Sequence, residues 1–403
     1  MSLYKIKGNI ITPMRVINNG EACFEADNKS GSRIIYVGVQ KNDDSFYNVI
    51  DCSGKFVAPG FIDIHVHGGG GHDFMDGTVD AFLGAARLHA SHGTATLLPT
   101  TLTCPDEELF EVFEVFEKAK NTENDGSFLA GLHLEGPYFS KEQKGAQDEN
   151  YLKLPKKEHY TKILEAGKNK ILRWSVAPEL VGALELGTEL KKLGITASIG
   201  HSDALYEQAI EAYESGYTLL THFYSGMSTL VRKDGFRYPG LIESGYMLED
   251  FDVEVIADGC HLPPSMLKYV YRTKGAGKVA LITDAMRGAG QTEGETILGS
   301  LKNGFTVYIE DGVAKLADRK AFGGSVATTD RLVRNMVKLA SVDICDAVRM
   351  MTMTPAKLVN LKTKGVLSAG FDADFTIFDD NINVEMTISN GKVIFERDNN
   401  GYN

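Results

Sequence analysis

The central part of the chain alternates short apolar runs with helical patterns, and this alternation limits the folds it can adopt. Segments with helical spacing, such as 106–119, 184–193, 203–215 and 265–273, separate runs rich in β-branched and other apolar residues. Strands that alternate with helices predict a parallel sheet with helical crossovers. The eight predicted strands are 61–67, 95–99, 128–135, 171–176, 195–201, 219–222, 253–258 and 279–284.

Eight such units predict an α/β fold, a (β/α)8 TIM-like barrel. A doubly wound open sheet is the alternative fold. No GxGxxG follows a predicted strand, which disfavours a dinucleotide-binding version of that alternative. After the eighth strand, the glycine-rich segment 285–324 contains a predicted hairpin at 305–316, and 331–339 and 344–353 are predicted to be closing helices.

Both ends of the chain have the pattern of β-strands joined by turns. The strand-like segments are 5–11, 33–39, 374–378 and 384–388. Turn signals occur at Asn18-Asn19-Gly20 and, as a hairpin signal, at Asn390-Gly391. We therefore predict two domains. Residues 1–57 and 356–403 form a small β-sandwich domain built from both chain termini, and residues 58–355 form the barrel domain.

Charge and cysteine content exclude several classes of partner. The formal net charge is −12, so we expect neither nucleic acid nor an anionic membrane surface as a partner. The five cysteines are scattered and never in CxxC spacing, which argues against a disulfide framework or a thiolate metal site. No apolar run is long enough to span a bilayer, and the N-terminus lacks a signal-peptide pattern. We therefore expect a cytoplasmic protein.

Polar residues stand at the ends of the predicted strands. They are His65, His67, Glu135, His201, His222 and Asp284. Because side chains alternate along a strand, His65 and His67 point the same way. One such residue is usually a cap, but six buried polar groups at one rim are costly unless a shared cation compensates them. A carboxylate with several imidazoles predicts a divalent metal site, suited to zinc or iron(II).

Two of these residues have further expected roles. Glu135 is anionic and can bridge two ions. Asp284 is the candidate proton carrier, because it can deprotonate the water that the metal activates and later protonate a leaving group. The alternative for Asp284 is an N-cap or a sixth metal ligand. The alternative for His65 and His67 is a pair that caps a core strand.

Six sequence blocks follow one another over essentially the whole chain, and five of them contain these residues. They are His-x-His (65–67), His-Leu-Glu-Gly-Pro (133–137), Gly-His-Ser (200–202), Thr-His-Phe-Tyr (221–224), Ile-Ala-Asp-Gly-Cys-His (256–261) and Thr-Asp-Ala-Met (283–286). Together they resemble the N-acetylglucosamine-6-phosphate deacetylases of the amidohydrolase superfamily. The His-Leu-Glu-Gly-Pro block is the most specific, because many relatives instead use a carboxylated lysine on the fourth strand, where this chain has none.

The resemblance implies an activity and a ligand set. The activity is metal-dependent hydrolysis of a linear amide C–N bond in amino-sugar catabolism, with N-acetylglucosamine-6-phosphate as substrate and glucosamine-6-phosphate and acetate as products. In that family pattern Glu135, His201 and His222 would hold the main metal. His65 and His67 would serve a second metal, so one or two ions per chain are expected.

The same resemblance implies residues for catalysis, for substrate binding and for assembly. Asp284 would be the acid and base. The implied substrate-binding residues are Ala146, Gln147, Ser225, Gly226, His261, Phe322, Gly323 and Gly324. An arginine that reaches the phosphate from a second subunit would fall on Arg237, with Arg232 and Lys233 as alternatives. A homodimer with shared active sites is therefore expected.

The chain departs from the family pattern in the expected substrate pocket. The family usually has His where this chain has Gln147, and Asn-Ala where it has Ser225-Gly226. The exact sugar therefore stays open, and another acylated amino sugar, such as N-acetylgalactosamine-6-phosphate, or a cyclic amide is the alternative substrate. A catalytically dead scaffold is a third hypothesis. Such a protein would be expected to lose metal ligands or Asp284, and all of them are present.

Overall fold

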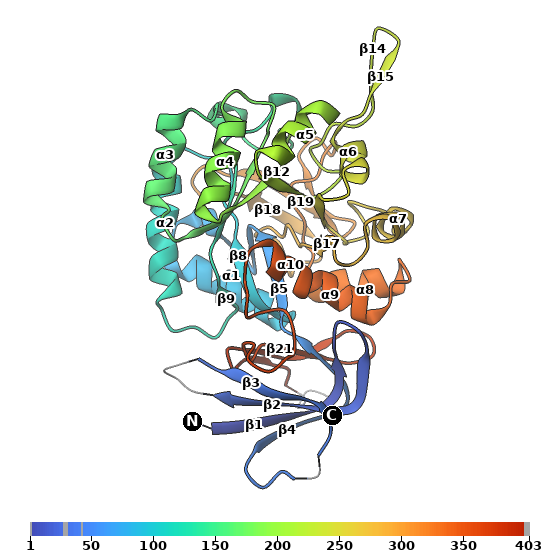
Figure 1. Ribbon diagram of the computed structural model, residues 1–403. Coiled ribbons are helices and arrows are strands. Elements are labelled where there is room, and N and C mark those ends of the chain that lie inside the picture. The colour runs from blue at the N-terminus through green and yellow to red at the C-terminus, as the bar shows by residue number, and fades with distance from the viewer. Residues whose placement is uncertain (1, 27–30, 42, 399–403) are drawn as a thin grey trace.

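The computed structural model describes residues 2–26, 31–41 and 43–398. Its main body consists of parallel strands surrounded by helices, and a separate β-sheet lies against one end of that body (Figure 1). The chain starts in this sheet, runs through the body and returns to the sheet near its C-terminal end. Both chain ends therefore contribute strands to one sheet.

The body contains all the strands predicted for the central part of the chain. They are β5 (Phe61–Val66), β8 (Thr94–Pro99), β9 (Phe128–Leu129), β10 (Leu132–Glu135), β11 (Ile171–Val176), β12 (Thr196–Ile199), β13 (Tyr217–Leu220), β16 (Asp252–Val255) and β17 (Val279–Leu281). The segment predicted as one strand over 128–135 forms two short strands, β9 and β10. Most of these strands are buried along their whole length, which explains their continuous apolar runs.

These strands form two parallel sheets. One has the order β10-β11-β12-β13-β16-β17 and the other the order β5-β8-β9. The larger sheet follows the chain order and lacks the reversal that a doubly wound sheet contains. Two isolated parallel bridges, Thr100 with His133 and Val66 with Ala285, connect the two sheets. The fold is therefore α/β, with a parallel sheet that forms half of a barrel.

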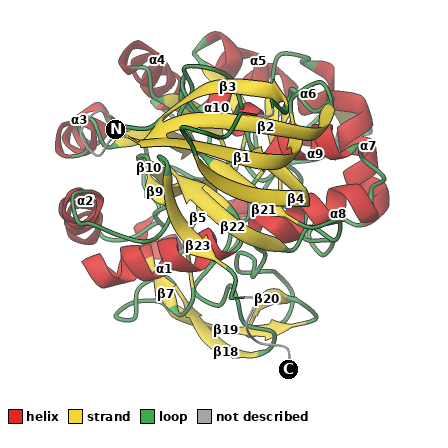
Figure 2. Cartoon of the chain, turned by 90° about the horizontal axis from the view of Figure 1, so that it is seen from below, coloured by secondary structure: helices red, strands yellow, loops and turns green. Residues whose placement is uncertain are grey.

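Helices lie around the outside of the parallel strands (Figure 2). They are α1 (Val79–Ser91), α2 (Asp106–Lys120), α3 (Lys157–Ala166), α4 (Ala183–Leu193), α5 (Tyr206–Glu214), α6 (Leu241–Met247), α7 (Pro264–Lys274), α8 (Thr329–Lys338), α9 (Ile344–Met351) and α10 (Met353–Leu358). The α2 helix illustrates why these segments form helices. Its first turn contains acidic residues and its last turn contains lysines, which suits the helix dipole, and its buried residues recur at helical spacing. Among the described residues, no helix is both long and apolar enough to cross a membrane.

The sheet from the chain ends has seven strands in the order β23-β22-β21-β4-β1-β2-β3. They are β1 (Ser2–Ile11), β2 (Val16–Ala26), β3 (Arg33–Val39), β4 (Asn48–Pro59), β21 (Phe375–Phe378), β22 (Val384–Ser389) and β23 (Lys392–Glu396). The predicted turn at Asn18-Asn19-Gly20 is wrong. These residues lie within β2, where Asn19 has a φ of 48° and the pairing with β1 shifts register, so the turn signal marks a β-bulge.

Hydrogen bonds attach this sheet to the amino ends of the parallel strands. β4 ends at Pro59, and β5 begins two residues later. Thr376 Oγ1 on β21 accepts a bond from the Phe61 amide (3.1 Å) and donates to the Gly93 carbonyl (2.6 Å). The carboxyl ends of the parallel strands, on the opposite side of the body, are therefore left free for a functional site.

Two small strand clusters and a hairpin decorate the carboxyl ends. The strands are β6 (Gly68–Gly69), β7 (His72–Asp73), β14 (Val231–Lys233), β15 (Phe236–Tyr238), β18 (Gly294–Leu298), β19 (Phe305–Glu310) and β20 (Val313–Leu316). The predicted hairpin at 305–316 is β19 and β20, and β18 adds a third strand to it. The predicted closing helices are α8 and α9, and a break at Thr352 separates α9 from α10.

Candidate active site

The six strand-end residues meet at the carboxyl ends of the parallel strands. His65 and Glu135 belong to β5 and β10, and His67, His201, His222 and Asp284 follow β5, β12, β13 and β17 within three residues. His201, His222 and Asp284 have positive φ values of 48°, 32° and 48°. A left-handed conformation is uncommon for residues other than glycine and is found where the surroundings impose it, often at functional sites. Here it turns three side chains inward.

Glu135, His201 and His222 form the first candidate ligand group. Glu135 Oε1 lies 3.3 Å from His201 Nε2 and 3.1 Å from His222 Nε2, and the two Nε2 atoms are 3.2 Å apart. The opposite ring nitrogens donate to backbone carbonyls, His201 Nδ1 to Gln143 (2.9 Å) and His222 Nδ1 to Ser225 (3.1 Å). When both rings are neutral, their Nε2 lone pairs face the same carboxylate oxygen. Two imidazole nitrogens and one carboxylate oxygen form a set of ligand atoms that suits a bound cation.

His65, His67 and Asp284 form the second group. Asp284 Oδ1 lies 3.4 Å from His65 Nε2 and 3.1 Å from His67 Nε2. Glu135 stands between the groups, with Oε1 3.3 Å from His65 Nε2 and Oε2 3.4 Å from His67 Nε2. Among the described residues, buried His65 Nε2 has no partner with hydrogen-bond geometry. A cation at this position would satisfy that nitrogen, so the residues fit two metal positions that share Glu135.

The charges of the cluster depend on one another. Burial opposes the charged imidazolium, but Glu135 and Asp284 outweigh it and raise the pKa of His65 to about 9. Burial likewise opposes ionisation of Glu135, yet His65, His201 and His222 hold the pKa of its carboxyl well below the usual range. Burial lowers the pKa of His222, which favours its neutral form. Protons and divalent cations therefore compete for the same imidazole nitrogens, and metal affinity is expected to increase with pH.

A buried ion pair lies beneath the cluster and was missed from the sequence. Arg173 on β11 and Glu254 on β16 are fully buried, with Arg173 Nη2 2.8 Å from Glu254 Oε2. The same oxygen accepts a bond from the His222 amide (3.2 Å) and lies 3.5 Å from His65 Nδ1. Glu254 therefore contacts one member of each ligand group. The signal in the sequence is a charged residue within the apolar run Val253-Glu254-Val255, inside a strand and not at its end.

One cavity opens above the two ligand groups. Its lining includes His67, Glu135, His201, His222 and Asp284 and seven of the eight expected substrate-binding residues: Ala146, Gln147, Ser225, Gly226, His261, Phe322 and Gly324. His65 lies beneath, with its side chain fully buried. Gly323 is the expected residue that does not line the cavity, and a Cβ at its position would be 3.2 Å from Val307 Cγ1. Gly226 must remain small, because a Cβ there would approach His201 Nδ1 to 2.9 Å.

Two of the lining side chains are held in place by neighbours. Gln147 Nε2 donates to Glu135 Oε2 (2.7 Å), and its Oε1 accepts from the Thr103 amide (2.9 Å). Gln147 thus contacts a metal-ligand candidate directly. The Nδ1 of His261 lies 2.8 Å from Asp258 Oδ2, so Asp258 orients the ring at the cavity rim. Sequence reasoning missed Asp258, although it lies in the matched block 256–261.

Arg237 is remote from the rest of the predicted site within its own chain. It lies on β15 of the β14–β15 hairpin, which projects from the body (Figure 1), and its Nη1 donates to the Gly235 carbonyl at 3.1 Å. The alternatives Arg232 and Lys233 lie on β14, and Arg232 pairs with Arg237 across the hairpin. All three candidates therefore belong to one exposed arm, and Phe236 beside them is 70% exposed.

The chain is similar to known proteins in sequence and fold. Residues 56–394 match the family model described as Amidohydrolase family. An N-acetylglucosamine-6-phosphate deacetylase of Lysinibacillus sphaericus is 32% identical over 354 residues, which cover 87% of this chain and 88% of that protein. The Homo sapiens protein of the same name is 33% identical over 364 residues, which cover 86% of this chain and 85% of that protein. A solved structure of N-acetyl-D-glucosamine-6-phosphate deacetylase from Mycobacterium smegmatis, in complex with N-acetyl-D-glucosamine-6-phosphate, has a TM-score of 0.88 at 28% identity and covers 98% of this chain and 100% of that chain.

Proposed function

We propose, because this chain belongs to the amidohydrolase family and within it to the N-acetylglucosamine-6-phosphate deacetylases, that it hydrolyses N-acetylglucosamine-6-phosphate to glucosamine-6-phosphate and acetate. The observation that carries the proposal is the pair of ligand groups at the floor of one cavity, with Glu135 of the first group in contact with the histidines of the second. The reaction breaks a linear amide C–N bond and belongs to amino-sugar catabolism.

Glu135, His201 and His222 would hold the main metal ion, and His65 and His67 a second one. Zinc or iron(II) suits a set of imidazoles with carboxylates. When bound, such a cation supplies Lewis acidity, which polarises a carbonyl and lowers the pKa of water from about 16 to about 7. The protein's own contribution is to aim the histidine Nε2 atoms, which the carbonyls of Gln143 and Ser225 do by accepting from Nδ1.

Asp284 would carry the proton. Burial opposes its ionisation, but His65 and His67 hold the pKa of the Asp284 carboxyl below its usual range, so it is ionised and able to accept a proton. Water attacks the amide carbonyl carbon and gives its proton to Asp284. As the C–N bond breaks, Asp284 delivers this proton to the sugar nitrogen, so that the amine leaves neutral and the water oxygen leaves in acetic acid, which loses its remaining proton to solvent to give acetate.

The sugar phosphate would occupy the outer part of the cavity. Ser225, Gly226, Phe322 and Gly324 also line the cavity, and Asp258 fixes the ring of His261 there. Ala146 and Gln147 line the side next to Glu135. We assign the phosphate to Arg237 of a second subunit, with Arg232 and Lys233 as alternatives, because the hairpin that carries all three projects from the body. The assembly would then be a homodimer with shared active sites.

We propose that the two parallel sheets close into a (β/α)8 barrel over residues 58–355, which the bridges between Thr100 and His133 and between Val66 and Ala285 support. Residues 1–57 and 356–403 would form the small domain, as a β-sandwich. A cytoplasmic location, without nucleic acid or membrane as partner, agrees with the net charge of −12 and the scattered cysteines.

Replacing Asp284 by asparagine tests the proposed chemistry. The asparagine side chain would keep the shape and a carbonyl donor but could not carry the proton, so kcat for N-acetylglucosamine-6-phosphate should decrease about 10²- to 10⁴-fold. Metal content should stay near that of the wild type, and the pH profile of kcat/KM should lose its acidic limb. Asp318→Asn, at an exposed site, is the matched control. Activity of Asp284→Asn within tenfold of the wild type would show that another group carries the proton.

A further inference from the structure

The active-site cavity has one apolar side. Leu102, Ala146 and Leu298 line it there, whereas His261 and Ser225 give the opposite part a polar character. Leu298 is 2% exposed and belongs to a small apolar cluster with Met286 and Val307, against which Leu102 and Ala146 also pack. The apolar side is therefore a wall of packed side chains.

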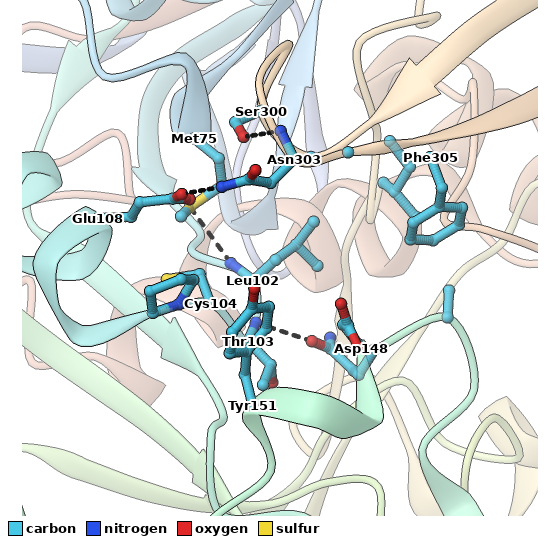
Figure 3. A pocket seen from close by; sticks show the side chains of 16 residues that line it. Met75, Leu102, Thr103, Cys104, Glu108, Asp148, Tyr151, Ser300, Asn303 and Phe305 are labelled. Atoms are coloured by element: carbon cyan, nitrogen blue, oxygen red, sulfur yellow. Dashed lines mark hydrogen bonds between the residues drawn. The ribbon is translucent and has the colours of Figure 1, made fainter.

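A second cavity shares this wall with the active-site cavity, and Figure 3 shows it from close by. Leu102, Ala146, Gln147 and Leu298 line both cavities, so these four residues form the partition between them. The far side of the second cavity includes Met75, Cys104, Tyr151 and Phe305. Its charged lining consists of Glu108 and Asp148, with no cationic side chain in the part of the chain that the structure describes. Two carboxylates without a cation disfavour a phosphate, and Met75, Leu102 and Phe305 provide apolar surface for an uncharged alkyl group.

The substituents of the acyl carbon determine which group of the substrate faces the partition. The acyl carbon carries an oxygen, a nitrogen and a methyl group. In the proposed reaction the oxygen faces the metal-ligand groups, and the nitrogen faces Asp284 and carries the sugar toward the polar side. The methyl group is the remaining substituent, and the apolar wall is the surface that suits it. A longer N-acyl chain would continue in the same direction, into the partition.

Within the partition Leu102 is the side chain that can limit chain length without another duty. Ala146 is already small, Gln147 bonds Glu135, and Leu298 is buried in the apolar cluster. Leu102 is only partly buried, and it follows β8 in a loop segment where its amide contacts Met75 Sδ at 3.4 Å. Figure 3 shows Leu102 between Met75 and Thr103 at the centre of the second cavity's lining.

We propose that Leu102 sets the length of the N-acyl group that the enzyme accepts, and that the cavity behind it receives longer acyl chains once Leu102 is shortened. The inference rests on the proposed deacetylase function. It assigns to the second cavity a ligand class, the alkyl end of an N-propionyl or N-butyryl amino-sugar phosphate. It also makes Leu102 a specificity-determining residue for the reaction.

The test compares kcat/KM for the N-acetyl, N-propionyl and N-butyryl forms of glucosamine-6-phosphate. One methylene in an apolar pocket changes kcat/KM about 10- to 200-fold, so the wild type should prefer acetyl to butyryl by at least about 100-fold. Leu102→Ala should shift the butyryl-to-acetyl ratio at least about tenfold toward butyryl. Leu102→Met, which keeps the side-chain volume, should retain the wild-type ratio.

The possible outcomes test the role of Leu102 and the deacetylase function separately. If Leu102→Ala hydrolyses the acetyl substrate without a gain for butyryl, or if the wild type already uses butyryl as well as acetyl, the assignment of Leu102 is wrong and the deacetylase function stands. If the wild type releases no acetate from the acetyl substrate, the proposed function itself fails. Leu102→Val removes one carbon and should extend the limit to propionyl, so this variant decides the matter if Leu102→Ala does not fold.

Discussion

At the scale of single residues, substitution of Glu254 is expected to have the largest effect on metal binding among the residues that do not line the cavity. It is fully buried, accepts from Arg173 and from the His222 amide, and lies 3.5 Å from His65 Nδ1. A carboxylate at Nδ1 fixes the ring orientation and keeps the Nε2 lone pair directed at the metal position. Glu254 is thus expected to be a positioning residue for His65.

We predict that Glu254→Gln weakens metal binding at the His65 and His67 position about 10- to 100-fold, as loss of a carboxylate behind a histidine ligand does. The measurement is a titration of metal content against a competing chelator. Because the single change leaves Arg173 buried without its partner, it also destabilises the fold by about 3–5 kcal/mol. A double variant, Arg173→Met with Glu254→Gln, removes both charges and should regain stability but keep the weak metal binding. Wild-type metal affinity in the double variant would show that Glu254 does not orient His65.

The metal-ligand candidates could be found from the sequence because each one directly follows an apolar run. Parallel strands end at one edge of a sheet, so residues as distant in the chain as His65 and Asp284 were expected to meet there. Glu254 and Arg173 lie inside strands, where burial depends on which face turns inward, and a single sequence does not state this. The contact between Gln147 and Glu135 arises from a loop, whose path no periodic pattern predicts.

At the scale of secondary-structure elements, α1 supports the glycine-rich segment that follows β5. His89 in the last turn of α1 is fully buried, and its Nε2 donates to the Gly68 carbonyl at 2.9 Å. A side chain at Gly69 would meet the same ring at 3.0 Å, so the glycines let the loop lie against the helix. This contact holds the backbone directly after His67.

We predict that His89 makes the protein less stable in mild acid. Burial lowers the pKa of His89 from its ordinary 6.5 to about 4. Between these values the unfolded chain binds a proton that the folded chain does not, so stability falls as the pH decreases from 6.5 to 4, by about 3 kcal/mol. His89→Gln keeps an N–H donor for Gly68 but does not titrate.

The measurement is the free energy of unfolding in urea, determined at pH 7 and pH 4 for both proteins with chelator present. The wild type should lose about 3 kcal/mol more than His89→Gln across this interval. Chelator removes the competition between protons and metal, and the remaining ionisable groups are common to both proteins. Equal losses in the two proteins would mean that His89 is protonated in the folded state or exposed to water.

Elements with a clear period were predictable, and irregular ones were not. Each parallel strand was found because burial on both faces selects a continuous apolar run. The Asn18-Asn19-Gly20 segment was misread because residues that tolerate positive φ serve both turns and bulges, and only the partner strand decides between them. β18 was missed because its sequence, Gly294 to Leu298, is short and only partly buried.

At the scale of the whole molecule, the β14–β15 hairpin is the feature that a single chain does not explain. It projects from the body with Arg232 and Arg237 side by side and with an exposed Phe236. We predict that Arg237→Ala raises KM about 10- to 100-fold for the phosphorylated substrate, because a charge-assisted hydrogen bond is lost, and changes KM little for N-acetylglucosamine without phosphate.

Arg232→Ala is the matched variant, since it removes the same charge from the neighbouring strand. Sedimentation of the wild type should show a dimer, and Arg237→Ala should remain dimeric, so that the loss is assigned to the phosphate contact and not to assembly. A wild type that is fully active as a monomer would overturn the shared active site. A larger effect of Arg232→Ala would move the phosphate contact to Arg232.

The union of the two chain ends was predictable as a consequence of composition, because two β-rich ends flank a long α/β middle. Its form was not. Whether such strands make one sheet or two layers depends on pairings such as Phe375 with Pro59, which lie more than 300 residues apart. The attachment of this sheet through Thr376 to Phe61 and Gly93 likewise depends on side-chain hydrogen bonds that have no periodic signature.

Acetate release from N-acetylglucosamine-6-phosphate, followed while chelator-stripped protein is titrated with zinc or iron(II), tests the metal-dependent deacetylase most directly. The two ligand groups around Glu135 predict that stripped protein releases no acetate. Turnover should return as the ions bind, with one acetate formed for each glucosamine-6-phosphate. Full activity of the stripped protein, or no acetate from protein whose metal positions are filled, would contradict the function assigned to this site.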